Sequence, residues 1–175
     1  RSNIQQSETL EYSLGTVANR TFANVRNNDR AKFESPAIAE TLFAKAKEHL
    51  PPTFEGKQLH RFYENFRFYR YEEGQAFSPH RDGAKTIFIP SIQVSYLTCL
   101  IYLNDDLEGG QTRFFANMTS AFSGTPYLSV APETGTALIF EHDIWHEGAP
   151  VTKGKKYVLR TDVMYQNPPR RKKQK

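Results

Sequence analysis

Residues 70–82 read RYEEGQAFSPHRD, a stretch that ends on a histidine and an aspartate two positions apart. Successive side chains of an extended segment point to opposite faces. We therefore expect His80 and Asp82 to face one cavity and Arg81 to point away from it. A second histidine, His146, lies far downstream in a region that also has the pattern of strands. An HxD pair is a weak signal by itself, so its meaning depends on the sequence around it.

The donor set that this pattern would assemble is two imidazoles and one carboxylate. Three such ligands on one face of an octahedral metal leave three positions open, which is the arrangement of non-haem Fe(II) oxygenases. We take His80, Asp82 and His146, called the triad below, as the candidate metal ligands and catalytic centre. Glu141 and Asp143 offer a competing acidic set, but they fall on an expected turn. Two unrelated polar histidines are the alternative interpretation, and it leaves the aspartate unexplained.

The chain after residue 60 has the pattern of short strands. Aromatic, β-branched and apolar runs bounded by turn residues are typical of strands. We expect strands at residues 66–71, 76–80, 94–103, 112–115, 127–130, 136–140 and 157–165, with a polar loop at 117–125. Seven or eight short strands after one helix predict a mostly β (α+β) fold with a double-stranded β-helix, or jelly-roll, core.

One helix is expected before these strands, packed on the core. Ser35 is a good N-cap, and Pro36 is favoured at the first helical position. Apolar residues then recur every four positions and predict an inward face; they are Ile38, Leu42, Ala46 and Leu50. Two prolines, at positions 51 and 52, should end the helix. Residues 1–35 read as a loop-rich lead-in with one short strand near residues 15–19.

A basic residue on the last expected strand extends the candidate site. Lys156 follows His146 by ten positions, and a lysine inside a barrel is costly unless it meets an anion. Alternation along the strand places Arg160 on the same face as Lys156. A cosubstrate with a distal carboxylate would need such a cation at the far end of the cavity. The residues alone leave open which of the two cations binds it, and a solvated turn lysine is the other interpretation of Lys156.

Four blocks of sequence, in this order and spacing, carry a resemblance to a known family. They are RYEEGQAFSPHRD at 70–82, TCLIYLND at 98–105, GGQTRF at 109–114, and HEGAPV at 146–151 with GKKY at 154–157. These blocks resemble the prolyl 4-hydroxylase-like branch of the 2-oxoglutarate/Fe(II) dioxygenases. The resemblance covers about residues 62–165. It says little about residues 1–60, where the substrate-specific parts of this family usually lie.

The resemblance implies a role for each candidate residue. The triad matches the iron ligands, and Lys156 matches the basic residue that binds the 5-carboxylate of 2-oxoglutarate. Tyr71 matches a tyrosine that hydrogen-bonds this cosubstrate, and Tyr102 matches a position that often supplies a further hydroxyl. Residues 157–165 differ from those of the animal collagen-type enzymes, so collagen-type specificity is not expected. The resemblance transfers no role to Arg160, which stays a second candidate for binding the cosubstrate.

The implied activity is the hydroxylation of an unactivated C–H bond, with 2-oxoglutarate decarboxylated to succinate. Fe(II), 2-oxoglutarate and O2 are the implied cofactors, with ascorbate as an optional addition. The substrate would be a peptidyl residue or a small molecule. One alternative is nucleic-acid demethylation by the same chemistry. The other is a catalytically inactive barrel that serves as a binding module, and the intact triad with Lys156 argues against it.

Charge and length limit the partners and the domain organisation. The net charge is +4, but five of the last six residues are basic, and the rest of the chain carries 18 basic and 19 acidic side chains. A near-neutral body lacks the basic face that is typical of nucleic-acid binders, so a nucleic-acid partner is not expected. With 175 residues we expect one domain, at 1–169 with its core at 61–166, followed by a basic tail at 170–175. Oligomeric state is left open.

The single cysteine and the hydropathy of the chain bear on the cellular compartment of the protein. One cysteine, Cys99, excludes an internal disulfide framework and a cysteine zinc cluster. It fits a reducing compartment, so a cytoplasmic or nuclear location is favoured. The chain begins at Arg1 and not at Met, so the secretory pathway stays open. No apolar run approaches the roughly 20 residues that span a bilayer.

Overall fold

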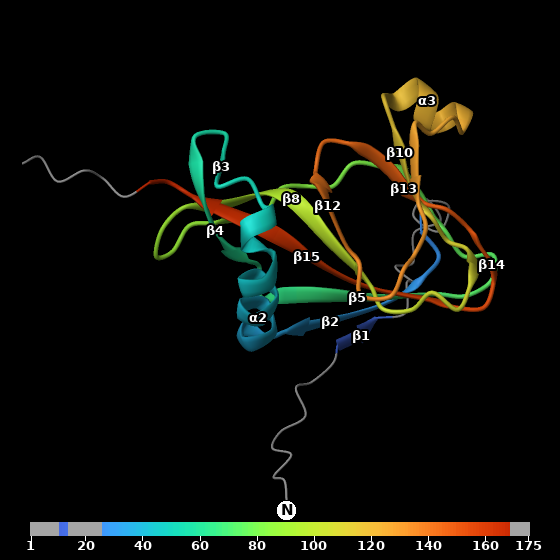
Figure 1. Ribbon diagram of the computed structural model, residues 1–175, viewed down its shortest axis with the longest axis horizontal. Coiled ribbons are helices and arrows are strands. Elements are labelled where there is room, and N and C mark those ends of the chain that lie inside the picture. The colour runs from blue at the N-terminus through green and yellow to red at the C-terminus, as the bar shows by residue number, and fades with distance from the viewer. Residues whose placement is uncertain (1–10, 14–25, 169–175) are drawn as a thin grey trace, which may run out of the picture.

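The computed structural model describes residues 11–13 and 26–168. About half of them form strands, which are arranged in three sheets (Figure 1). The largest has nine strands: β1 (Glu11–Ser13), β2 (Asp29–Glu34), β3 (Thr53–Phe54), β4 (Lys57–Phe62), β5 (Asn65–Tyr71), β7 (Thr86–Ile87), β8 (Gln93–Tyr102), β12 (Ala137–Glu141) and β15 (Lys156–Gln166). The second has β6 (Phe77–His80), β10 (Thr112–Phe115), β11 (Leu128–Val130) and β13 (Trp145–Gly148), and the third pairs β9 (Glu108–Gly109) with β14 (Val151–Lys153). The expected mostly β, jelly-roll architecture is confirmed.

The strand β15 organises the large sheet. Along one edge it pairs with β8, and along the other it pairs first with β5 and then with β4, all antiparallel. Its side chains alternate between the two faces of the sheet. Val163 packs in the core cluster on the outer face, whereas Lys156, Val158 and Arg160 line a cavity on the inner face. The second sheet lines the opposite side of this cavity, so the candidate site lies between the two sheets.

The helix α2 (Pro36–Ala46) covers the outer face of the large sheet and is followed by a 3-10 turn, Lys47–His49 (Figure 1). The Ser35 hydroxyl accepts a hydrogen bond from the Ile38 amide at 3.4 Å, as the expected N-cap. Ala39 is buried in the outer core cluster with Phe62 and Phe66. Together with residues of β8 and β15, this cluster holds the helix on the sheet.

The expected inward face of α2 is partly wrong. Ile38 is 40% exposed, and Ala39 is the buried residue of the helix. An α-helix has 3.6 residues per turn, so a spacing of four advances about 40° around the helix at each step. Residues at that spacing therefore drift away from a single face. Leu42, Ala46 and the buried Leu50 do pack with the core cluster, and the first residue of the series does not.

Two expected loops contain regular structure. Residues 29–34 form β2, an edge region of the large sheet, where the carboxylate of Asp29 pairs with the guanidinium of Arg70 on β5. The expected polar loop at 117–125 contains the short helix α3 (Met118–Ser123), capped by the Asn117 side chain and ended by Gly124 in the left-handed conformation. Strands also begin before residue 60, in β3 and β4. The strand expected near residues 15–19 and the basic tail lie outside the described residues.

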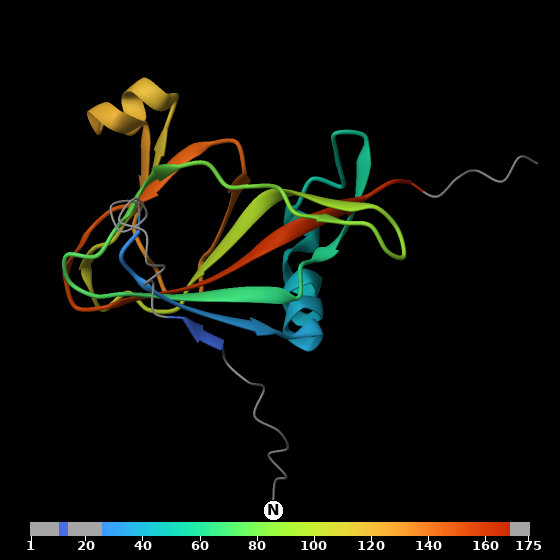
Figure 2. The same ribbon diagram turned by 180° about the vertical axis from the view of Figure 1, so that it is seen from behind.

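Figure 2, the view from behind, shows α2 and α3 far apart, with α2 on the large sheet and α3 at the other side of the molecule. The helix α3 sits beyond the ends of β10 and β13, on the side of the second sheet. Among the described residues, no helix combines the length and apolar character needed to cross a bilayer.

Candidate metal centre

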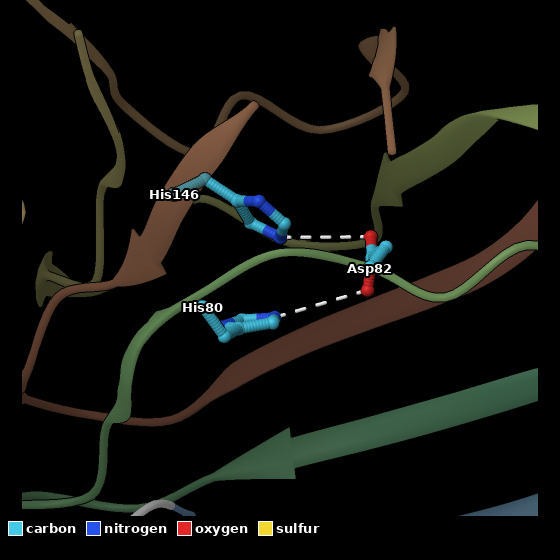
Figure 3. A group of neighbouring side chains, drawn as sticks. All are labelled: His80, Asp82 and His146. Atoms are coloured by element: carbon cyan, nitrogen blue, oxygen red, sulfur yellow. Dashed lines mark ion pairs between the residues drawn. The ribbon is translucent and has the colours of Figure 1, made fainter. Parts of the chain in front are cut away.

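The triad comes together between the sheets (Figure 3). His80 on β6 and His146 on β13 are direct cross-strand partners, and Asp82 follows β6 by two residues. The Nε2 atom of His80 lies 3.8 Å from Oδ1 of Asp82, and Nε2 of His146 lies 3.6 Å from Oδ2. The candidate ligand atoms all lie within 4.8 Å of one another. Arg81 points elsewhere, because its guanidinium pairs with Asp143 at 2.6 Å and stacks over the Trp145 ring.

The tautomers of both histidines follow from their neighbours. Nδ1 of His80 lies 2.8 Å from the Ser78 carbonyl oxygen, and Nδ1 of His146 lies 2.9 Å from the Ile144 carbonyl oxygen. A carbonyl can only accept, so each Nδ1 carries the proton and donates it. Each Nε2 atom is therefore unprotonated and directs its lone pair toward Asp82. Metal-binding histidines usually have this second hydrogen bond, which fixes the ring and its tautomer.

Aromatic rings pack against the two imidazoles, and burial lowers the pKa of both. The Phe77 ring stacks on His80 with centroids 3.6 Å apart, and Phe140 meets His146 edge-on at 4.5 Å. Burial, followed by the neighbouring His146, lowers the pKa of His80 to about 4. Burial also lowers the pKa of His146. Both rings are thus neutral at neutral pH, the form in which a histidine binds a metal.

The Asp82 carboxylate is held at both oxygens. The Thr98 hydroxyl donates to Oδ2 at 2.6 Å, and the Arg160 guanidinium lies 3.0 Å from Oδ1. Burial by itself raises the pKa of Asp82, but Arg160, His146 and Thr98 together outweigh it and hold the pKa below its usual value. The side chain is therefore an ionised carboxylate. Two neutral imidazole nitrogens and one carboxylate fit the donor preferences of an Fe(II) site that keeps positions open.

Lys156 is the cation that points into the cavity without an acidic partner among the described residues. Its Nζ donates to the Gly110 carbonyl oxygen at 2.5 Å and lies above the rings of Tyr71 and Tyr102. The residue is 4% exposed, and burial lowers its pKa to about 8. A buried ammonium with only carbonyl and ring partners is unfavourable, so a ligand carboxylate at this position would gain a charged hydrogen bond.

Arg160 is differently placed. Its guanidinium lies 3.0 Å from Asp82 and 3.2 Å from Asp162, so two carboxylates already neutralise it. Burial alone lowers its pKa, but these two acids outweigh burial and the pKa is raised. The sequence alone left open which cation could bind a distal carboxylate. The contacts favour Lys156 for that role and tie Arg160 to the triad.

The two tyrosines singled out in the sequence are both buried but have different access to the cavity. Tyr71 lines it directly. Tyr102 does not; its hydroxyl donates to the Thr112 hydroxyl oxygen at 2.7 Å, and Thr112 lines the cavity. Since the Thr112 oxygen accepts from Tyr102, its own proton is free to point at a ligand. The Gly-Gly-x-Thr order was the available signal for Thr112, and the sequence by itself favours only a structural interpretation of that threonine.

Three further residues near the triad were missed. Thr98 and Ser95 lie in the apolar run of β8 and are completely buried, and His142 is 6% exposed. The His142 ring is bonded to both hydroxyls, with Nδ1 2.9 Å from Thr98 and Nε2 2.8 Å from Ser95. The signal in the sequence was a pair of polar residues inside a buried strand. Their partner could not be found without the register between β8 and β12.

The chain matches a family model. Residues 66–161 match the model of the 2OG-Fe(II) oxygenase superfamily. This range runs from β5 into β15. Among curated proteins, "Probable prolyl 4-hydroxylase 9" of Arabidopsis thaliana is 34% identical over 172 residues, covering 89% of this chain and 56% of that protein. "Prolyl 4-hydroxylase 13" of the same plant is 31% identical over 113 residues, covering 55% of this chain and 41% of that protein. The chain thus spans about half the length of the curated relatives it matches.

Solved structures share the fold at lower identity. The viral collagen prolyl hydroxylase of Paramecium bursaria Chlorella virus-1, in complex with 2OG, has a TM-score of 0.58 at 23% identity, covering 81% of this chain and 80% of that one. A prolyl hydroxylase from Trichoplax adhaerens, in complex with a hypoxia inducible factor oxygen degradation domain peptide fragment, has a TM-score of 0.62 at 16% identity, covering 89% and 70%. At these identities the likeness concerns the fold.

Proposed function

Because this chain belongs to the 2OG-Fe(II) oxygenase superfamily, we propose that it is a 2-oxoglutarate- and Fe(II)-dependent hydroxylase of the prolyl 4-hydroxylase type. The observation that supports this most is the convergence of two unprotonated Nε2 atoms and one carboxylate within 4.8 Å, beside the buried Lys156. Iron, when bound, supplies the activation of O2 and the oxidising power that an unactivated C–H bond requires. The chain's own residues bind and orient the reactants.

We assign the triad as the Fe(II) ligands. His80 and His146 offer Nε2 lone pairs, and Asp82 offers a carboxylate that reduces the net charge of the site. A metal held by these three side chains would keep coordination positions available for 2-oxoglutarate and O2. The stacked Phe77 and the edge-on Phe140 keep both rings from rotating.

We assign Lys156 as the anchor of the 5-carboxylate of 2-oxoglutarate. The hydroxyls of Tyr71 and Thr112 lie along the same cavity and supply further donors. Tyr102 acts behind Thr112 by donating to its oxygen. Apolar neighbours such as Leu100 and Val158 also line this cavity and exclude water from it. Arg160 takes the role of holding Asp82 in its ionised form.

The substrate class that we propose is a peptide with a prolyl residue. Its support is the similarity to two curated plant proteins named as prolyl 4-hydroxylases. The runner-up substrate is a small molecule. Neither nucleic-acid demethylation nor an inactive binding barrel is favoured by these relatives. A need for ascorbate and a cytoplasmic or nuclear location stay predictions.

Incubating the full chain in air with Fe(II), 2-oxoglutarate and either a panel of proline-containing peptides or a pool of small metabolites tests this proposal. We expect a gain in mass of one oxygen atom on at least one peptide, located on proline by fragmentation, with succinate formed alongside. The matched controls are the same peptides with alanine in place of proline, and the Asp82→Ala variant. Oxygen incorporation only into metabolites, or only into the alanine peptides, would reject the prolyl assignment.

A further inference from the structure

Thr98 connects the triad to His142, a buried histidine that is not itself a candidate ligand. The oxygen Oδ2 of Asp82 lies 2.6 Å from the Thr98 hydroxyl, and an ionised carboxylate can only accept. The Thr98 hydroxyl must therefore use its one proton on Asp82. Its oxygen can then only accept from its other neighbours.

The position of each further proton follows from this constraint. Nδ1 of His142 lies 2.9 Å from the Thr98 oxygen, so Nδ1 carries a proton and donates it. In the neutral ring Nε2 is then the acceptor, and it takes the proton of the Ser95 hydroxyl at 2.8 Å. The Ser95 oxygen in turn accepts from the Lys85 backbone amide at 2.8 Å. All the hydrogen bonds from that amide to the triad are therefore donated in the same direction.

The backbone of His142 also binds Asp82. Its carbonyl oxygen accepts from the Asp82 amide at 2.9 Å, and its own amide donates to the Tyr96 carbonyl at 2.8 Å. One residue thus contacts the main chain of Asp82 directly and the carboxylate through Thr98. Thr98 and Ser95 are fully buried and His142 is 6% exposed, so water competes little for the hydrogen-bonding groups of this network.

We propose that His142 is a positioning residue, which fixes the direction of the Thr98 hydroxyl and through it the orientation of the Asp82 carboxylate. Without the Nδ1 donor, only the longer hydrogen bond from the Arg160 guanidinium, 3.4 Å from the Thr98 oxygen, still orients this hydroxyl. The Thr98 hydroxyl and the Asp82 carboxylate then gain rotational freedom before metal binding. This inference rests on the proposed function, because it concerns the same metal centre. Hydrogen-bond partners of a ligand typically contribute about 10- to 100-fold to metal affinity.

Titration of the metal-free full chain with Mn(II), followed by electron paramagnetic resonance of free Mn(II), tests the inference without turnover. We expect Thr98→Val and His142→Phe each to weaken Mn(II) binding by about tenfold or more. Thr98→Ser keeps the hydroxyl, and His142→Asn places an amide N–H near the position of Nδ1. Both conservative variants should bind within about threefold of the unaltered chain, which a merely structural loss would not reproduce.

The double variant Thr98→Val/His142→Phe decides whether the two residues act in series. We expect it to bind Mn(II) no more weakly than Thr98→Val alone, since His142 would act only through that hydroxyl. Multiplying losses would overturn the inference, as would a His142→Phe variant with unchanged affinity. Ser95→Ala, a smaller change with an expected loss in the same direction, replaces His142→Phe if thermal melting shows that the latter is unfolded; unchanged affinity in Ser95→Ala then overturns the inference. An unaltered chain that binds no Mn(II) would instead overturn the proposed function and this inference together.

Discussion

Two buried cations lie on one face of β15, and their contacts indicate different roles for them. Arg160 lies between Asp82 and Asp162, whereas Lys156 touches only a carbonyl and two aromatic rings among the described residues. Side-chain alternation predicted that both would face the cavity. It could not predict that Arg160 would also meet Asp82, because Asp82 lies in the segment after β6, whereas Asp162 is two residues further along β15.

Lys156→Met should weaken 2-oxoglutarate binding by about 10- to 100-fold, the value of one charged hydrogen bond. Mn(II) binding to the triad should stay within about threefold, because Lys156 contacts none of its members. Arg160→Met should instead weaken Mn(II) binding, because Asp82 loses its charged partner. Calorimetric titration of both variants with metal and then with cosubstrate measures the two effects. The reverse pattern would move the cosubstrate anchor to Arg160.

The pH dependence of cosubstrate binding follows from Lys156. Burial lowers its pKa to about 8 in the free protein, and a bound carboxylate raises it. Affinity should therefore be constant below pH 8, where the ammonium is already charged, and should fall as the pH rises above 8. Dissociation constants for 2-oxoglutarate, measured with Mn(II) and without O2, check this. Lys156→Arg should remove the decline because arginine keeps its charge, and a flat profile in the unaltered chain would argue against Lys156 as the anchor.

At the scale of elements, the sequence predicted most strands that carry the site, but the short strand β13, which carries His146, was not among them. The expected strand at residues 94–103 agrees with β8 to within one residue at each end, because a long buried run has few alternatives. The strand β2 lies between β1 and β5, and it was missed because its sequence, DRAKFE, is mostly polar. The helix α3 was missed because it is short and is held by local capping bonds, which a polar composition does not reveal.

The close pairing of β9 with β14 restricts residue 109 to glycine. Its φ is +78°, and a Cβ there would lie 2.4 Å from the Pro150 carbonyl oxygen. Gly135 also has a positive φ, of +86°, but a Cβ there would meet nothing within 4 Å. Gly135→Ala should cost about 1–2 kcal/mol from backbone strain alone, and Gly109→Ala about 1–3 kcal/mol more from overpacking.

Chemical denaturation of these two variants compares the costs directly. Equal losses of unfolding free energy would mean that β14 can move away from β9, contrary to the close contact described above. Because Gly110 follows and its carbonyl accepts from Lys156, Gly109→Ala should also weaken 2-oxoglutarate binding, whereas Gly135→Ala should not.

At the scale of the whole molecule, the two sheets bring together residues that are remote in the sequence. The order of the motifs predicted that the triad would meet, and the cap and apolar spacing of residues 35–50 predicted a helix on the core. The sequence did not predict the chain of buried hydroxyls and imidazole behind Asp82. That chain depends on three-dimensional register among β8, β12 and the turn that follows β12.

Metal binding should stabilise the folded chain as a whole. A ligand at 100 times its dissociation constant adds about 2.7 kcal/mol to the free energy of unfolding. For a protein of this size that corresponds to a rise in melting temperature of about 5–10 °C. Thermal melts with Mn(II) and with a chelator measure the shift, and Asp82→Ala should abolish it. A shift of the same size in Asp82→Ala would place the metal elsewhere.

The formation of succinate from 2-oxoglutarate in the presence of Fe(II) and O2, with no second substrate added, tests the function of the triad most directly. The unaltered chain should form succinate slowly and only with Fe(II), and His146→Ala should form none while melting as a folded protein. Succinate formation by His146→Ala at the rate of the unaltered chain, or its absence from the unaltered chain, would contradict a 2-oxoglutarate-dependent iron centre at His80, Asp82 and His146.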